Sequence, residues 1–346
     1  MEESVKRKTW LIIFFIFSVF LLTGHANAGV IFQDNFNAQN NWTLPQPMNA
    51  PNTCWVNCNV PSGWDHYYDG RSFCPGGPGK NNMYIDSVNS RGGSGKGLTF
   101  WDESCVDFVE DSDGQIGKFL GADYQEVYVR FYIKFSPTYK WKEGEFSPFH
   151  KFIHIWSYGG SGEPYNFFNR NNNEPVFVGN FEKYLNNIST MLAYRCEVNY
   201  YCQGTPRYQF DVCCEFGKDD EIMSTWAALH DGQWHSVEYN LKMNTYNAGP
   251  NTFNADGVVR FWLDGNLIYS VANVPWKDNG GTPSRGFNSI SIGGNNYNRW
   301  TTSCSGTSCE QWYAVDDVIV STTYIGPGGA VSDTTPPNPP SGFFVD

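Results

Sequence analysis

The segment 231–274 constrains the fold of this chain most strongly, because its apolar residues recur at every second position. This period of two is typical of a strand that is buried on one face. The dipeptide Asp264-Gly265 interrupts the pattern and predicts a tight hairpin turn, since glycine accepts a positive φ. The segment therefore predicts an antiparallel meander in an all-β protein. Its three expected strands are 235–243, 258–263 and 267–271.

Other parts of the chain show the same alternation, and the first of these strands is expected at an edge beside the last. By contrast, Asp111-Ser112-Asp113-Gly114 is interpreted as a solvated turn, although its spaced oxygens resemble part of a calcium loop. The further predicted strands are 30–36, 98–101, 126–135, 150–156, 287–293 and 312–322.

Two of these strands carry polar residues that alternate with apolar ones. In 126–135, Val129, Phe131, Ile133 and Phe135 are expected to face the core, opposite Tyr128, Arg130, Tyr132 and Lys134. In 150–156, Phe152, His154 and Trp156 are expected on one face, opposite Lys151, Ile153 and Ile155.

The segment 191–216 predicts a hairpin whose turn is centred on Thr205. This register gives one apolar face and places Cys196 opposite Cys214, near disulfide range. We therefore predict the disulfide Cys196–Cys214. A second bridge, Cys304–Cys309, is expected across a short loop.

The N-terminal residues 1–28 have the pattern of a signal peptide. Three basic residues precede a short apolar stretch, and Ala26-Asn27-Ala28 fits a cleavage site. We expect a secreted protein, extracellular or periplasmic, with no membrane association after cleavage. Ten cysteines in such a chain indicate disulfides rather than zinc.

Composition divides the remaining chain into a domain, 29–326, and a Pro/Gly-rich linker, 327–346. The end of the linker resembles the start of a fibronectin type III module. Within the domain, 37–97 is rich in loop-forming residues and is expected to be stapled by Cys54, Cys58 and Cys74, with Cys105 as a further partner. The net charge of −12 argues against nucleic acid as a partner.

Three segments resemble the concanavalin A-like lectin/glucanase superfamily: WHSVEYNLKMNT, DGVVRFWLDGNLIY and WYAVDDVIVSTTYIG. The segment YVRFYIKFSPTYKW looks most like secreted polysaccharide lyases of jelly-roll fold, of the alginate or glucuronan lyase type. The resemblance covers 126–326 and implies a β-sandwich that acts on a polysaccharide.

The lyase resemblance implies a β-elimination on a uronate and requires no cofactor. Arg130 would neutralise the carboxylate of the uronate. His154 would accept the proton from C5, and Tyr132 would protonate the leaving oxygen. Other polar or aromatic residues are expected to contact the glycan. They are Lys134, Trp156, Arg195, Glu197, Asn199, Asp211 and Glu215.

Two other functions stay open. A glycan-binding module without catalysis would use tryptophan and tyrosine platforms, and the chain has 13 Trp and 20 Tyr. A β-glucanase-like hydrolase would place carboxylates at alternate positions of YQFDVCCEF, but Gln209 stands at the position of the nucleophile. Asp316 and Asp317, with Asp34, leave open a structural calcium where the first and last strands meet.

Overall fold

The computed structural model describes residues 29–44, 52–69, 82–103, 111–141, 149–160, 175–184, 187–195, 229–277, 281–296, 298 and 310–328. The chain divides into two compact units, Met1–Val30 and Ile31–Asp346. The expected signal peptide lies outside the described residues, as does most of the expected linker. No helix in the part of the chain that the structure describes is long and apolar enough to cross a membrane.

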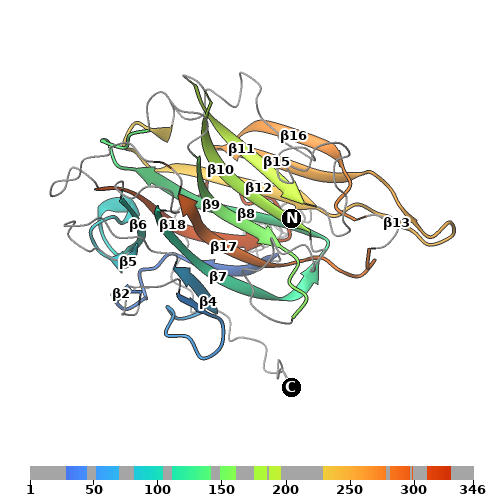
Figure 1. Ribbon diagram of the computed structural model, residues 1–346, viewed down its shortest axis with the longest axis horizontal. Coiled ribbons are helices and arrows are strands. Elements are labelled where there is room, and N and C mark those ends of the chain that lie inside the picture. The colour runs from blue at the N-terminus through green and yellow to red at the C-terminus, as the bar shows by residue number, and fades with distance from the viewer. Residues whose placement is uncertain are drawn as a thin grey trace, which may run out of the picture. The chain divides into compact units, whose positions relative to one another are not determined.

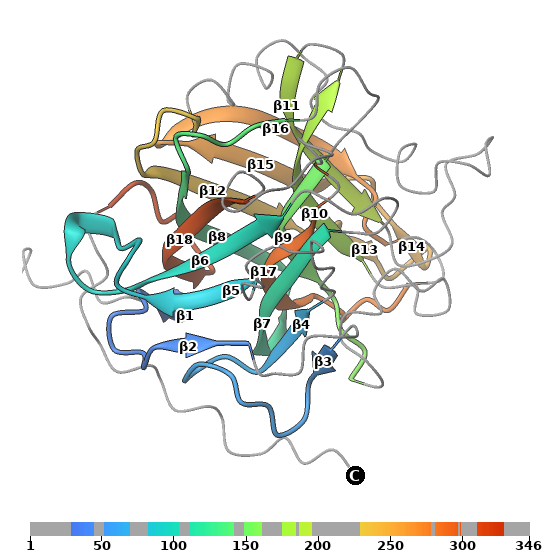
Figure 2. The same cartoon turned by 60° about the vertical axis from the view of Figure 1, so that its left-hand side comes forward.

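The described residues of the second unit form two large antiparallel sheets (Figures 1 and 2). Sheet A consists, in spatial order, of β16 (Asn266–Val274), β15 (Gly257–Leu263), β12 (His235–Lys242), β8 (Glu126–Phe135), β18 (Glu310–Ser321), β6 (Gly97–Glu103), β5 (Met83–Asp86) and β2 (Trp42–Thr43), and β1 (Val30–Asp34) also pairs with β18. Sheet B consists of β11 (Asn187–Arg195), β10 (Val176–Tyr184), β9 (Phe149–Trp156), β17 (Phe287–Asn296), β7 (Asp111–Tyr124), β4 (His66–Asp69) and β3 (Asn52–Cys54).

Two smaller features complete the described structure. Strands β13 (Tyr246–Asn247) and β14 (Thr252–Phe253) form a short separate ladder. A single 3₁₀ turn, η1 (Arg91–Gly93), lies between β5 and β6.

The inner faces of sheets A and B pack against each other through aromatic and aliphatic residues. Phe131 of β8 lies 6.2 Å from Phe152 of β9, measured between ring centroids. Tyr239 of β12 lies 5.2 Å from Phe177 of β10 by the same measure. These residues belong to one buried apolar cluster that takes in strands of both sheets. The fold is therefore an antiparallel β-sandwich, and the expected resemblance to concanavalin A-like jelly rolls is confirmed at the level of fold.

The predicted meander is confirmed in both order and turn geometry. Strands β12, β15 and β16 are neighbours in sheet A, and Asp264 and Gly265 both have positive φ, as the two-residue turn requires. The alternation predicted for β8 is also confirmed, because Val129, Phe131 and Ile133 are buried in the core.

The alternation predicted for β9 is wrong at Lys151 and Phe152. The register of β9 against β10 shifts between Gly179 and Asn180, so β9 contains a bulge. As a result, Phe152 joins Ile153 and Ile155 in the core, while His154 lies on the outer face.

The turn predicted at residues 111–114 is also wrong, because these residues begin the long strand β7. Its Gly114 lies at a close approach that a side chain would block, since an added Cβ would be 2.9 Å from Cγ of Met83. A Cβ on Gly293 of the neighbouring β17 would lie 2.0 Å from the carbonyl oxygen of Gly114. The backbones pack too tightly there for larger residues, which explains a glycine-rich strand.

One pair of the cysteines expected to form disulfides lies within the described residues. Cys54 and Cys58 form a disulfide in the loop-rich N-terminal part. The predicted bridges Cys196–Cys214 and Cys304–Cys309 lie outside the described residues, as do Cys74 and Cys105. Residues 191–195 of the predicted 191–216 hairpin are the end of β11, which pairs with β10, and the rest of the hairpin lies outside the described residues.

After β18 the chain continues over the outer face of sheet A as residues 322–328, called here the exit segment. The two carboxylate oxygens of Glu238 accept hydrogen bonds from the backbone N–H groups of Ile325 and Gly326, both at 2.8 Å. At the β15–β16 turn, a Cβ on Gly265 would meet Pro327. These contacts bury polar residues of β12 that the sequence pattern places toward solvent.

Candidate functional site

The three residues predicted to form one catalytic group lie on different sheets. Arg130 and Tyr132 belong to β8 of sheet A, and His154 belongs to β9 of sheet B. Their strand neighbours Phe131 and Ile153 face the core, so the predicted catalytic residues point to the two opposite outer faces. One sugar unit cannot contact all three.

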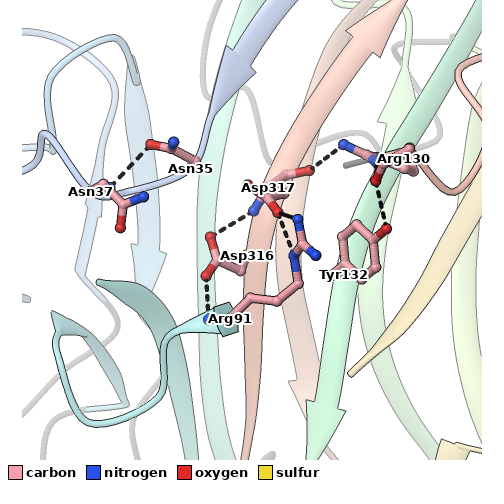
Figure 3. A network of polar contacts seen from close by, with 8 residues as sticks. Asn35, Asn37, Arg91, Arg130, Tyr132, Asp316 and Asp317 are labelled. Atoms are coloured by element: carbon pink, nitrogen blue, oxygen red, sulfur yellow. Dashed lines mark hydrogen bonds and ion pairs between the residues drawn. The ribbon is translucent and has the colours of Figure 1, made fainter. Parts of the chain in front are cut away.

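Arg130 and Tyr132 hold the exit segment instead. The hydroxyl of Tyr132 donates to the carbonyl oxygen of Gly328 at 2.9 Å, and Nη1 of Arg130 approaches the same oxygen at 3.4 Å. Arg130 is buried, and burial lowers the pKa of its guanidinium. Figure 3 shows Arg130 and Tyr132 next to Asp317, whose carbonyl oxygen lies 3.5 Å from Nη2 of Arg130. Lys134, also on the outer face of β8, is partly exposed.

Asp316 and Asp317 are partnered by Arg91 (Figure 3). The backbone N–H of Arg91 donates to Asp316 at 2.8 Å, and its guanidinium forms an ion pair with Asp317. The guanidinium also lies 3.9 Å above the ring of Tyr132. Burial, opposed by the Arg91 N–H and reinforced by the charge of Asp317, raises the pKa of Asp316 to about 7.

The proposed calcium ligands do not fit a bound cation. Oδ2 of Asp34 already accepts hydrogen bonds from the side chains of Gln39 and Trp64. The Arg91 guanidinium already stands against Asp317, where it would repel a second cation. In the described residues there is no group of three or more His, Cys, Asp or Glu placed to hold a metal.

The outer face of sheet B brings together a different set of polar residues. Four strands place His66, Gly117, Ser291 and His154 in one row, each the register partner of the next. The adjacent row runs through Phe119, Ser289, Trp156, Val176 and Arg195. Small residues therefore occupy β17 in both rows and β7 in the first row, and larger side chains flank them.

His154 lies at one end of a hydrogen-bonded chain of three side chains. Its Nδ1 is 3.3 Å from the hydroxyl oxygen of Ser291, and that hydroxyl donates to Oε1 of Gln115 at 3.1 Å. All three residues are buried. Burial and the nearby charge of Lys151 hold the pKa of His154 well below its usual value. The imidazole is therefore neutral at neutral pH and able to accept a proton.

Lys151 and His154 flank the same glycine. A Cβ on Gly294 would lie 2.6 Å from the Cβ of Lys151 and 3.0 Å from Cε1 of His154. The β9 bulge makes this arrangement, because it leaves Lys151 and His154 on one face although they are three residues apart. The charge of Lys151 is thus close enough to contribute to the lowered pKa of the imidazole.

Two tyrosines border the same cluster. Tyr68 is the register partner of Gln115, and Tyr158 stacks on Phe119 at 5.1 Å between ring centroids. Both pack against the small apolar cluster that includes Trp156 and are only partly buried. Each therefore offers a phenol near the His154 chain.

His66 has a packing role in this face. Its ring lies over Gly117, where an added Cβ would be 1.9 Å from Cε1 of His66. The ring also lies 4.6 Å from Phe119 and 6.0 Å from Trp156, between centroids. Burial and the charge of Lys118 lower the pKa of His66 to about 3, so it stays neutral.

The remaining predicted contact residues fall in two groups. Trp156 is on this face, and the register of β11 places Arg195 opposite Val176, in the same row. Glu197, Asn199, Asp211 and Glu215 lie outside the described residues, and so does the YQFDVCCEF segment on which the hydrolase alternative depends.

Sequence reasoning missed Gln115, Tyr68 and Ser291. Gln115 was hidden because its glycine-rich segment was interpreted as a turn, and Tyr68 because its segment was interpreted as a loop. Ser291 lies on a strand that was predicted, and its alternation with Ile290 and Ile292 is the signal that could have found it. Only the sheet order shows that these residues share a face with His154.

The chain matches no protein-family model and no curated protein. Its fold is similar to that of a variant of the alginate lyase Aly36B in complex with an alginate trisaccharide, at 12% identity and a TM-score of 0.43 over 69% of this chain and 83% of that chain. An endo-β-1,4-glucuronan lyase from the fungus Trichoderma reesei is 13% identical, with a TM-score of 0.41 over 74% and 94%. The cellulose induced protein Cip1 is 14% identical, with a TM-score of 0.40 over 86% and 99%. At these identities the likeness concerns the fold, and a reaction has to be argued from the side chains.

Proposed function

We propose that the outer face of sheet B binds a uronate-containing polysaccharide and cleaves it by β-elimination. The observation that carries the proposal is the neutral, buried His154, which is hydrogen-bonded through Ser291 to Gln115 and shares its face of β9 with Lys151. A base, a cation and a hydrogen-bond donor beside one another are the groups that this reaction needs.

The chain's own residues divide the chemistry as follows. Lys151, with the amide of Gln115, neutralises the carboxylate of the uronate and so makes the C5 proton acidic. His154 accepts that proton. The C4–O4 bond then breaks as the C4–C5 double bond forms, and the phenol of Tyr68 donates its proton to the leaving O4. These assignments replace Arg130 and Tyr132, which hold the exit segment on the other face.

A non-catalytic glycan-binding face remains the second candidate. Its supporting observation is the aromatic border formed by Phe119, Tyr158 and Trp156. Phe119 and Tyr158 are only partly buried and could stack on a sugar ring, whereas Trp156 is buried beneath them.

Product analysis separates the candidates. The full chain is incubated with alginate, glucuronan or pectate, and the products are examined by mass spectrometry. Elimination gives unsaturated oligosaccharides, lighter by one water than the products of hydrolysis. We expect these from the wild type, a loss of about 10²-fold or more in rate for His154→Ala, and a partial recovery in Lys151→Arg relative to Lys151→Met. Saturated products would identify a hydrolase, and retention of a polymer without products would identify a binding module.

A further inference from the structure

Three aromatic residues gather on the outer face of sheet A, away from the candidate site. Trp262 of β15 and Tyr324 of the exit segment lie 5.2 Å apart between ring centroids. Tyr128 of β8 lies 6.4 Å from each of them. None of the three belongs to a core cluster, and Tyr324 is 47% exposed. This ring cluster (Tyr128, Trp262 and Tyr324) therefore has faces available to water.

A line of polar side chains runs beside the ring cluster. Nη1 of Arg260 donates to Oδ1 of Asn240 at 2.9 Å, and Nδ2 of Asn240 donates to Oε1 of Glu126 at 3.1 Å. The hydroxyl of Tyr128 donates to the same oxygen at 3.2 Å. Arg260 and Glu126 are both partly exposed. The line thus holds a guanidinium with further N–H donors and a carboxylate whose Oε2 takes part in none of these bonds.

The exit segment does not require this polar line. Its backbone is bound through Glu238, Arg130 and Tyr132, one or more register positions further along the strands. A surface that only anchored the segment would need the rings but not a fixed guanidinium and carboxylate next to them. The line and the rings together point to a ligand with both apolar and hydroxyl-bearing surfaces.

We propose that the ring cluster and the Arg260–Glu126 line form a second carbohydrate-binding surface, separate from the face that carries His154. The apolar face of a pyranose ring stacks on the aromatic side chains. Its neighbouring hydroxyls donate to Glu126 and accept from Arg260. Because the charges of Arg260 and Glu126 balance each other, the surface selects hydroxyl-rich pyranose units and not carboxylates. It holds a neutral stretch of polysaccharide while leaving the opposite face of the sandwich open.

Affinity electrophoresis of the full chain tests the proposal with the fewest assumptions. The gels contain hydroxyethyl cellulose, mixed-linkage β-glucan or galactomannan as neutral probes, and alginate as the acidic probe. We expect at least one neutral polymer to retard the wild type and His154→Ala equally, which shows that the surface acts independently of the candidate site. Tyr324→Ala and Arg260→Gln should each lower the affinity measured from this retardation by about 10-fold. The first removes a stacking ring, and the second removes the guanidinium that donates to the sugar hydroxyls.

Tyr246→Ala is the matched control, because Tyr246 is an exposed tyrosine of the separate β13–β14 ladder. Its retardation should equal that of the wild type. Circular dichroism and thermal melting confirm that each variant is folded, and Arg260→Gln leaves all three rings in place if Tyr324→Ala disturbs the exit segment. The proposal is overturned if no neutral polymer retards the wild type, if Arg260→Gln and Tyr324→Ala bind as the wild type does, or if only alginate binds and His154→Ala abolishes that binding.

Discussion

Arg130 and His154 lie on opposite outer faces of the sandwich, with the core residues Phe131 and Ile153 between the two sheets. Both were expected to act on one uronate. Arg130 contacts the exit segment, whereas His154 is hydrogen-bonded to Ser291. Mutation of the two residues should therefore have different effects on activity. The predictions below depend on this division.

Glu238→Ala should release the exit segment. The variant leaves the backbone N–H groups of Ile325 and Gly326 without their acceptor, and a lost buried hydrogen bond costs about 1 to 3 kcal/mol. Hydrogen exchange at these two amides should accelerate strongly, with a smaller change at β12. Unchanged protection of both amides would show that Glu238 does not hold the segment.

Gly117→Ala should disturb the face that carries His154. The new Cβ would stand 1.9 Å from Cε1 of His66, so the ring must move, and overpacking of this kind costs about 1 to 3 kcal/mol. Urea denaturation measures the loss. The matched control is Gly249→Ala, since the nearest atom there would be 3.7 Å away. Equal stability of the two variants would contradict the close contact between His66 and Gly117.

His235 should make stability depend on pH. Its Nδ1 lies 2.8 Å from Asp264 and its Nε2 lies 2.9 Å from Asp231, so only the protonated ring donates to both carboxylates. Burial opposes the charge, but these hydrogen bonds outweigh it and raise the pKa of His235 above 6.5. The stabilisation is therefore fully present below pH 6.5 and is lost as the pH rises through the raised value.

Thermal melting of the wild type and His235→Gln at about pH 6 and about pH 9 measures this contribution. Because both carboxylates are largely exposed, we expect a difference of only about 1 to 2 °C between the two proteins, present at the lower pH and absent at the higher. A difference in melting temperature that grows as the pH rises would contradict a raised pKa of His235.

The strands themselves were largely predictable, because their signals are local. The alternation in β8, β12 and β15 and the Asp264-Gly265 turn each depend on residues close in the sequence. The glycine-rich start of β7 was missed, since its strand state depends on the close approach of Gly293 to Gly114.

The site was predictable only in part, because it depends on which sheet each strand joins. Arg130 and His154 look alike as outward residues on neighbouring predicted strands, yet β8 enters sheet A and β9 enters sheet B. The β9 bulge moves Phe152 into the core and leaves Lys151 beside His154, which simple alternation cannot show. The sheet assignment and the bulge both depend on pairing between strands that are far apart in the sequence.

The ultraviolet absorbance of unsaturated uronate, followed with time on a uronate polymer, tests the central claim most directly. The wild type, His154→Gln and Arg130→Met are compared at equal concentrations of folded protein. We predict that absorbance rises for the wild type and for Arg130→Met, and that His154→Gln lowers kcat by about 10² to 10⁴-fold. Full activity of His154→Gln, or loss of turnover in a folded Arg130→Met, would contradict an active site on the outer face of sheet B.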